Sequence, residues 1–592
     1  MKIFRLVNAE LRKIFLRPTI FVMIALLVLC SFISLIAFNP DTRSTDSNVT
    51  ISGATISEIY SNFKQDSSSS SFTTKYDLDN KLETALSNVE AFTQTDSVLS
   101  ELKNIADEGR QAQNDYHNLE IALENAIRPT GGLSNSTYFA QANSCLSAFS
   151  SSLKSTIIAF GNFKNSNKYY LETTKFNEIN EKLKKLDSTV VVYTTNQTKA
   201  VYENLLVSIR KYEFDRMMTS FISDVKEINI TTEKFNEIKE NYYSPAKLIL
   251  GDETNENSLM GKIQNYYLTN ASEGSQEKRD KFVELLSDYK AYINMACENL
   301  NCALNIEISN DISDKKMQTY LGYSNFNKLT TSALLEKNNY MIENRINPRT
   351  TLDAMNFGVN SGDETNAWDF VCFAMNITSL LIIIFCVIIC SKIIAGEQAG
   401  GTMKMLAIRP FSRNKILGGK LLATMFFSMI FVVFSFIVNL GIGWAFFGIS
   451  NQMMIGVFNG TNVIYSHPLI YCLFLILSLF MKVFIYVSIA TMISVLFRSY
   501  TGSSMVSFAI VIITLIMNGA LGTKHYFKYF PMANFDIYKY FTSAQTASGF
   551  KAIFSSPQII DTSFVFSFIY AIILIFFLNG ISFLVFNKKD IA

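Results

Sequence analysis

Six long apolar segments are the feature that most constrains this chain. A helix of about 20 apolar residues crosses the hydrocarbon core of a bilayer, which is about 30 Å thick. Hydrophobic residues make up 49% of the 592 residues, and the mean hydropathy of +0.19 also favours a membrane protein. The sequence therefore predicts an all-α membrane protein with six transmembrane helices. The segments cover about 19–38, 369–393, 417–449, 469–497, 502–521 and 561–586.

The first apolar segment is interpreted as a retained span. It is about 20 residues long, whereas the apolar part of a signal peptide has about 7–15, and no small-residue cleavage site follows it. Residues 1–18, "MKIFRLVNAELRKIFLRP", are expected to form a cytoplasmic amphipathic helix before it.

Basic residues beside the spans predict the orientation, because Lys and Arg gather on the cytoplasmic side. Five of the first 17 residues are basic, so the N-terminus is placed inside, and six spans return the C-terminal "NKKDIA" to that side. The loop 450–467 has no basic residue and is placed outside. The loop 522–560 is also placed outside, although it carries four lysines. Residues 39–366 then form a large extracellular domain between the first and second spans.

The extracellular domain is predicted to be mainly helical. Four prolines divide it into long proline-free pieces, and apolar residues recur at helical spacing around 99–126 and 201–212. Two short stretches, "VVVYTT" at 190–195 and "LNIEIS" at 304–309, favour strands. The apolar stripes are explained by ordinary helix packing or, alternatively, by a groove for a partner helix.

Eight cysteines fall into two groups. Five lie in or beside the spans, where a thiol behaves as a small hydrophobe. Cys145, Cys297 and Cys302 are expected outside, where disulfides persist. A bridge between Cys145 and one of the other two would join two helices, while a bridge within "CENLNC" would constrain little.

The chain lacks the usual signatures of catalysis. It contains no phosphate-binding loop, nucleophile elbow, zinc-protease motif or paired carboxylates, so no catalytic residue is assigned. Its three histidines are scattered, so no metal site is predicted. A net charge of +2 without a basic tract gives no support to nucleic-acid binding.

Lys482 is predicted about halfway along the fourth span, where a charge is costly and indicates function. The spans offer no acidic residue at a comparable depth. Either the helix is broken there and the amine reaches water or a carbonyl, or Lys482 faces a translocation path and meets an anionic group. The loop 522–560 interleaves aromatics with lysines around Pro531, which suits a re-entrant or interfacial piece or a surface lid.

The stretch between the second and third spans, "IIAGEQAGGTMKMLAIRPFSRNKILGGK" at 393–420, carries a turn and a short helix. Gly400 and Gly401 allow a sharp reversal of the chain. Met405 and Leu406 belong to the apolar face of a short helix, which Pro410 ends. A turn that only obeys the positive-inside rule would explain the charges but not this combination of residues.

This stretch resembles the cytoplasmic loop of type-2 ATP-binding-cassette (ABC) exporter permeases. The similarity lies in an acid, a Gly-Thr pair, an apolar helix, Pro-x-Ser-Arg and Gly-Lys, in that order. The loop, 394–416, would be a coupling helix that docks on a separate ATPase subunit. The six spans also suit the family, and the large insert resembles larger-ectodomain members of Gram-positive bacteria. The resemblance assigns the coupling role to Glu397, Gly401, Thr402, Met405, Leu406, Arg409, Pro410 and Arg413.

The resemblance implies the membrane subunit of an exporter. ATP and Mg²⁺ would be bound by the partner ATPase, and a second permease, identical or different, would complete the complex among membrane lipids. Peptide antibiotics, lipids and cell-wall glycoconjugates are the candidate substrates. The alternative is a non-transporting surface receptor or scaffold that acts through its helical ectodomain, for which one or two anchors would suffice.

Overall fold

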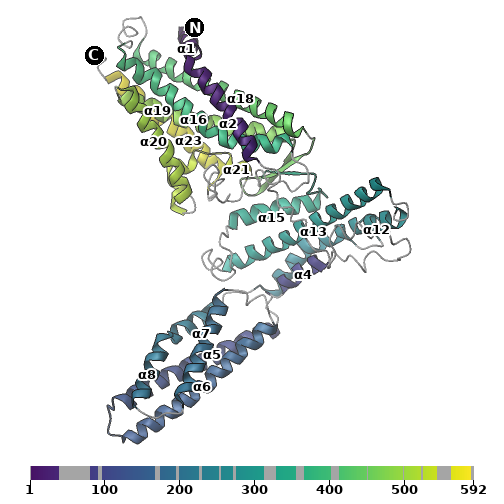
Figure 1. Ribbon diagram of the computed structural model, residues 1–592, viewed down its shortest axis with the longest axis vertical. Helices are drawn as coiled ribbons and strands as arrows, with labels where there is room; N and C mark the ends of the chain where they lie inside the picture. Colours follow the sequence, from purple (N-terminus) through teal and green to yellow (C-terminus); the bar gives the residue numbers. More distant parts are fainter. Residues whose placement is uncertain are drawn as a thin grey trace. The chain divides into compact units, whose positions relative to one another are not determined.

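A computed structural model describes most of the chain, which forms two compact units (Figure 1). The first unit draws on Met1–Phe72, Ile263–Tyr292 and Ser332–Ala592, and the second on Thr73–Lys262 and Ile293–Thr331. The described residues are 2–38, 80–90, 92, 96–166, 174–194, 199–225, 230–251, 255–270, 275–311, 328–354, 366–401, 412–449, 451–497, 499–521, 525–542 and 562–588.

The six predicted spans are confirmed as helices long and apolar enough to cross a membrane. They follow the amphipathic helix α1 (Lys2–Phe15), and both described chain ends lie at one end of the bundle, here called the terminal end (Figure 1). The spanning helices are α2 (Pro18–Ala37), α16 (Ala367–Ala399), α18 (Arg413–Phe447), α19 (Pro468–Leu496), α20 (Tyr500–Leu521) and α23 (Phe564–Lys588).

Local chemistry determines where two of these helices begin. The Asn366 side chain accepts hydrogen bonds from the backbone N–H groups of Trp368 and Asp369, at 2.9 and 3.2 Å, and so caps α16. His467 Nδ1 accepts the Leu469 N–H at 3.2 Å, and Pro468 occupies the first turn of α19. Both caps satisfy backbone donors that the helix itself cannot.

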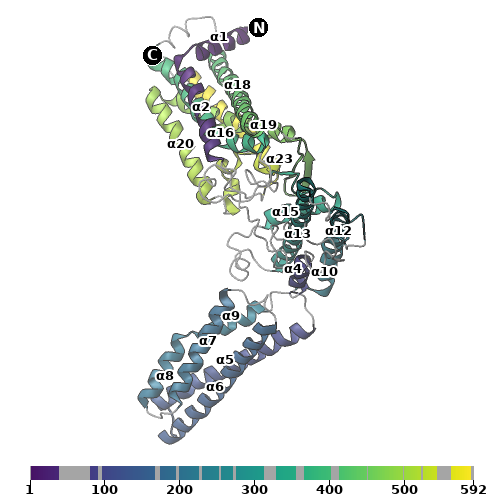
Figure 2. The ribbon, with the colours of Figure 1, turned by 45° about the vertical axis from the view of Figure 1, so that its right-hand side comes forward.

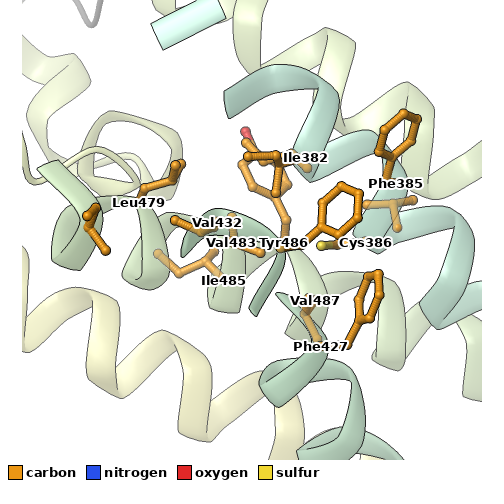
Figure 3. Packing of buried hydrophobic residues seen from close by; sticks show 14 of the residues in the cluster. Ile382, Phe385, Cys386, Phe427, Val432, Leu479, Val483, Ile485, Tyr486 and Val487 are labelled. Atoms are coloured by element: carbon orange, nitrogen blue, oxygen red, sulfur yellow. The ribbon is translucent and has the colours of Figure 1, made fainter. Parts of the chain in front are cut away.

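The core of the first unit lies between α16, α18 and α19 (Figure 3). Phe385 of α16 packs against Phe431 of α18 with ring centroids 5.9 Å apart. Val483 and Val487 of α19 are fully buried in the same cluster. These three helices therefore form the centre of the bundle, around which the other spans pack.

A small sheet lies at the opposite end of the bundle, here called the sheet end. It consists of β1 (Leu352–Asp353), β2 (Met454–Phe458) and β3 (Asn462–Ser466), with β1 parallel and β3 antiparallel to β2. Asn459 and Gly460 both have positive φ in the hairpin turn, as Asn-Gly turns favour. Only a loop was predicted at 450–467, so the hairpin differs from the prediction.

Three helices come directly before β1 in the described chain: α12 (Leu259–Asn270), α13 (Gln276–Asp311) and α15 (Lys328–Glu343). In the first unit, Lys337 of α15 pairs with Asp353 of β1 at 2.8 Å, and both side chains are only 7% exposed. Arg349 pairs with Asp288 of α13 at 2.8 Å. These ion pairs fasten α13 and α15 to the sheet end.

The second unit contains a helical bundle around a core of its own. Figures 1 and 2 show α5 and α6 side by side along their length. The predicted stripe in 99–126 is confirmed, since Tyr116, Leu119 and Leu123 are buried in this core. Up to Leu250, the helices of the second unit are α4 (Asn80–Glu90), α5 (Asp96–Ile127), α6 (Asn135–Ser166), α7 (Thr174–Tyr193), α8 (Lys199–Lys211), α9 (Phe214–Val225), α10 (Thr232–Ile238), η3 (Lys239–Tyr243) and α11 (Ser244–Leu250).

Both predicted strands were wrong. Residues 190–193 form the end of α7, where Val190 continues a helical series of buried residues that includes Leu183 and Leu186; Thr195 lies outside the described residues. Residues 304–309 lie within α13, where Leu304 and Ile308, four residues apart, are buried. In both places helical burial outweighs the strand preference of β-branched side chains.

Candidate functional site

Four charged side chains form a closed ring at the terminal end of the bundle. Glu10 and Lys13 come from α1, Glu397 from α16 and Lys420 from α18. Lys420 Nζ lies 2.6 Å from Glu397 Oε2 and 3.4 Å from Glu10 Oε2. Lys13 Nζ lies 3.1 Å from Glu10 Oε1 and 3.5 Å from Glu397 Oε1. Each carboxylate therefore contacts both amines.

The ring is largely shielded from solvent. Lys420 is 1% exposed, Glu10 3% and Glu397 13%, while Lys13 reaches the surface. Lys420 Nζ also donates to the Ile393 carbonyl at 3.4 Å. Because two acids alternate with two bases, the ring has no net charge. Burying charges is costly, and removal of one member would leave its partners uncompensated.

The sequence brings α1 to this site through its apolar face and a close helix contact. Val7, Glu10 and Ile14 share one face of α1, and all three are buried. A Cβ atom at Gly419 would lie 2.7 Å from Leu6 Cδ2, so glycine lets α1 lie directly against α18. Figure 2 shows α1 lying across the terminal end of the bundle.

The predicted coupling residues are only partly described. Glu397 joins the ring, and Gly401, with φ of +71°, ends the turn after α16. Arg413 opens α18 and donates to the Asn587 carbonyl at 3.1 Å, near the end of α23. Thr402, Met405, Leu406, Arg409 and Pro410 lie outside the described residues.

Three of the four ring members, Glu10, Lys13 and Lys420, were not predicted from the sequence to form a group with Glu397. Lys420 was noted only as part of Gly-Lys, and Lys13 only as a topology signal. Glu10 carried a readable signal, because it is an acid three residues after Val7 on the apolar face of an amphipathic helix. A charge on such a face needs a buried partner.

Lys482 has an ion-pair partner that the sequence did not suggest. Its Nζ lies 2.9 Å from Asp536 Oδ2, and both side chains are about one-fifth exposed. The helix α19 continues unbroken from Pro468 to Leu496, so the alternative of a helix broken at Lys482 was wrong. The carboxylate comes from the segment before α23 and not from a span, so the sequence of the spans could not indicate this partner.

The segment that carries Asp536 contains η4 (His525–Tyr529), η5 (Pro531–Asn534) and α21 (Lys539–Thr542). Phe535, Ile537 and Tyr540 are buried in the same core as the spanning helices. The Tyr540 hydroxyl lies 2.6 Å from Ser567 Oγ of α23. This packing favours a piece inserted among the helices over a surface lid.

All eight cysteines lie in described parts of the chain, and none of them forms a disulfide. The structure therefore does not contain the disulfide considered for Cys145, Cys297 and Cys302. Cys297 and Cys302 lie five residues apart on the continuous helix α13, which turns them to different sides.

Comparison with known proteins gives two matches. A family model described as "ABC-2 family transporter protein" matches residues 166–591. The uncharacterised protein YhcI of Bacillus subtilis (strain 168) is 28% identical over 234 residues, which cover 38% of this chain and 69% of YhcI. No solved structure matches the chain significantly.

Proposed function

The chain belongs to the ABC-2 family of transporter proteins, and from that premise we propose that it is the membrane-spanning permease subunit of an ABC exporter. The family implies a partner ABC ATPase subunit. In this proposal the partner binds ATP and Mg²⁺, and its hydrolysis drives an outward movement of substrate.

The ion ring is the observation that carries the coupling proposal. It joins α1, α16 and α18 at the terminal end, where α16 ends and α18 begins on either side of residues 402–411. A bound ATPase that displaces α1 or residues 402–411 would also move α16 and α18. The reason is that the buried charges of the ring cannot be separated without a large energetic cost. These two helices also form the central core with α19.

The proposed orientation places the terminal end in the cytoplasm. The basic residues of α1 and Lys415 and Lys588 lie at this end, as the positive-inside rule favours. The sheet end and the second unit would then face outward. A dimer of two permeases, identical or different, would form the path, and the substrate classes remain peptide antibiotics, lipids or cell-wall glycoconjugates.

Six spanning helices in a transporter family argue against the receptor or scaffold alternative. The test is to co-express the chain with a candidate ABC ATPase from the same genome, purify through a tag on the chain, and measure ATPase activity in lipid nanodiscs. We expect a stable complex with ATP turnover. Purification of the permease without any ATPase, in the presence of an expressed and folded ATPase, would contradict the proposal.

A further inference from the structure

An open groove lies within the second unit between α4 and the part of α13 that follows Ile293. Its volume is about 520 Å³, within the range of about 300–1,000 Å³ typical of ligand sites. Polar side chains form both of its walls. They include Asn80, Thr84 and Asn88 from α4 and Asn294, Glu298 and Asn301 from α13.

The wall residues form two rows because of their helical spacing. Asn80, Thr84 and Asn88 are four residues apart, and the three residues of α13 follow steps of four and three. Such steps place side chains on one face of a helix. At 1.5 Å per residue, the row on α4 is roughly 12 Å long.

The floor of the groove is small and uncharged. Ala85 is buried, and Cys297 is half-buried beside it. Burial raises the pKa of the Cys297 thiol to about 11, against a smaller opposing effect of Lys81, so the thiol is neutral at physiological pH. Small side chains let the main chain of a ligand approach the floor closely.

The groove also has unused hydrogen-bonding capacity. Asn88 Oδ1 is buried without a hydrogen-bond partner among the described residues. Lys81 Nζ, by contrast, donates to Asn294 Oδ1 at 3.5 Å and links the two walls. With Lys81 and Glu298 as its two charged residues, the lining has no net charge.

We propose that this groove binds an extended, uncharged peptide segment through its backbone. Carboxamide side chains donate and accept hydrogen bonds as peptide groups do, so two facing rows can pair with successive N–H and C=O groups. A row of roughly 12 Å matches about four extended residues at about 3.3 Å each. None of the described lining residues is aromatic, which disfavours a glycan, because sugar rings pack on aromatic faces. This proposal does not rest on the transport assignment.

The first test uses the full chain in detergent and a fluorescein-labelled, acetylated (Ser-Ala)₄ amide peptide as the probe. We expect saturable binding that weakens at least tenfold in the double variant Asn88→Leu/Asn301→Leu. The matched control Asn118→Leu, an exposed asparagine on α5, should stay within twofold of the wild type. Equal binding by the double variant and the wild type would overturn the proposal.

The second test uses the wild-type chain, so it holds even if a variant fails to fold. Alkylation of Cys297 by iodoacetamide at pH 9, followed by mass spectrometry, should slow at least fivefold with the peptide present. Cys145 on α6, also half-buried, should react at an unchanged rate. Protection of Cys297 by chitotetraose instead of the peptide, or by neither, would overturn the proposal.

Discussion

Lys420 of α18 lies 2.6 Å from Glu397 of α16, and only 1% of its side chain is exposed. Glu10 of α1 lies on the other side of the same amine, 3.4 Å away. Glu10 and Lys420, which are 410 positions apart in the sequence, thus form a buried ion pair. The N-terminal helix is therefore a structural part of the membrane bundle and not a separate surface element.

Lys420→Met should destabilise the protein strongly, because it leaves Glu10 and Glu397 buried with only Lys13 between them. Loss of one partner of a buried ion pair costs about 3–5 kcal/mol. Thermal unfolding in detergent measures the effect. The control is Lys415→Met on the same helix, where the side chain is exposed and little change is expected. Equal melting temperatures for the two variants would show that the ring does not stabilise the fold.

The sequence predicted the spans well, because apolar length alone decides whether a helix can cross a bilayer. It did not predict the ring, since local periodicity cannot show that Glu10 and Lys420 meet. Asp536 was missed for a similar reason, because depth cannot be assigned to a polar segment that folds back among the spans. The strand at 454–458 had a local signal in Asn459–Gly460, which was overlooked.

The coupling stretch carries a prediction that rests on the sequence. Met405→Asp and Leu406→Asp should each lose the ATPase in co-purification, because a carboxylate would replace an apolar anchor in the proposed interface without a partner. Glu397→Ala should lower the melting temperature, because Lys420 and Lys13 then have only Glu10 as an acidic partner in the ring, but the complex that forms should separate ATP hydrolysis from transport. Full ATPase and transport rates in the two Asp variants would show that the stretch is only a turn.

Gly443 allows α18 to cross α16 closely. A Cβ atom there would lie 3.1 Å from the Ala367 carbonyl oxygen and 3.3 Å from its Cα, and this backbone contact cannot move easily. Gly443→Ala should lower stability by about 1–3 kcal/mol. Gly441→Ala, two residues away on the same helix, meets nothing within 4 Å and should be neutral or slightly stabilising. Thermal unfolding of the two variants, measured side by side, tests this difference in stability, and equal melting temperatures would contradict it.

Lys482 and Asp536 should show energetic coupling. Either single variant, Lys482→Met or Asp536→Asn, leaves a half-buried charge without its partner, so the double variant should cost less than the sum of the two. A coupling of about 1–3 kcal/mol is expected. The exposed pair Lys182–Glu178, at 3.0 Å on α7, should give about 0.5 kcal/mol or less in the same cycle. Additive effects at Lys482 and Asp536 would mean that the pair does not hold the segment in place.

The buried Lys539 should make the stability of the folded protein rise between pH 8 and 10.5. Burial lowers the pKa of Lys539 from 10.5 to about 8, although Asp536 partly opposes this, and the amine donates to the Ala533 carbonyl at 2.8 Å. Below pH 8 both folded and unfolded chains hold the proton, so the cost of burying the charge is fully present. Between pH 8 and 10.5 the folded chain releases the proton first, and the cost disappears.

The fall in the pKa of Lys539 from 10.5 to about 8 corresponds to about 3 kcal/mol. We therefore expect Lys539→Met to be more stable than the wild type at pH 7, with the difference shrinking as the pH approaches 10. Thermal unfolding in detergent across this range measures the trend, and the exposed Lys415→Met should leave the pH dependence of the wild type unchanged. If Lys539→Met keeps a constant difference from the wild type at every pH, the amine does not lose its proton in the folded protein, and its charge is compensated within the bundle.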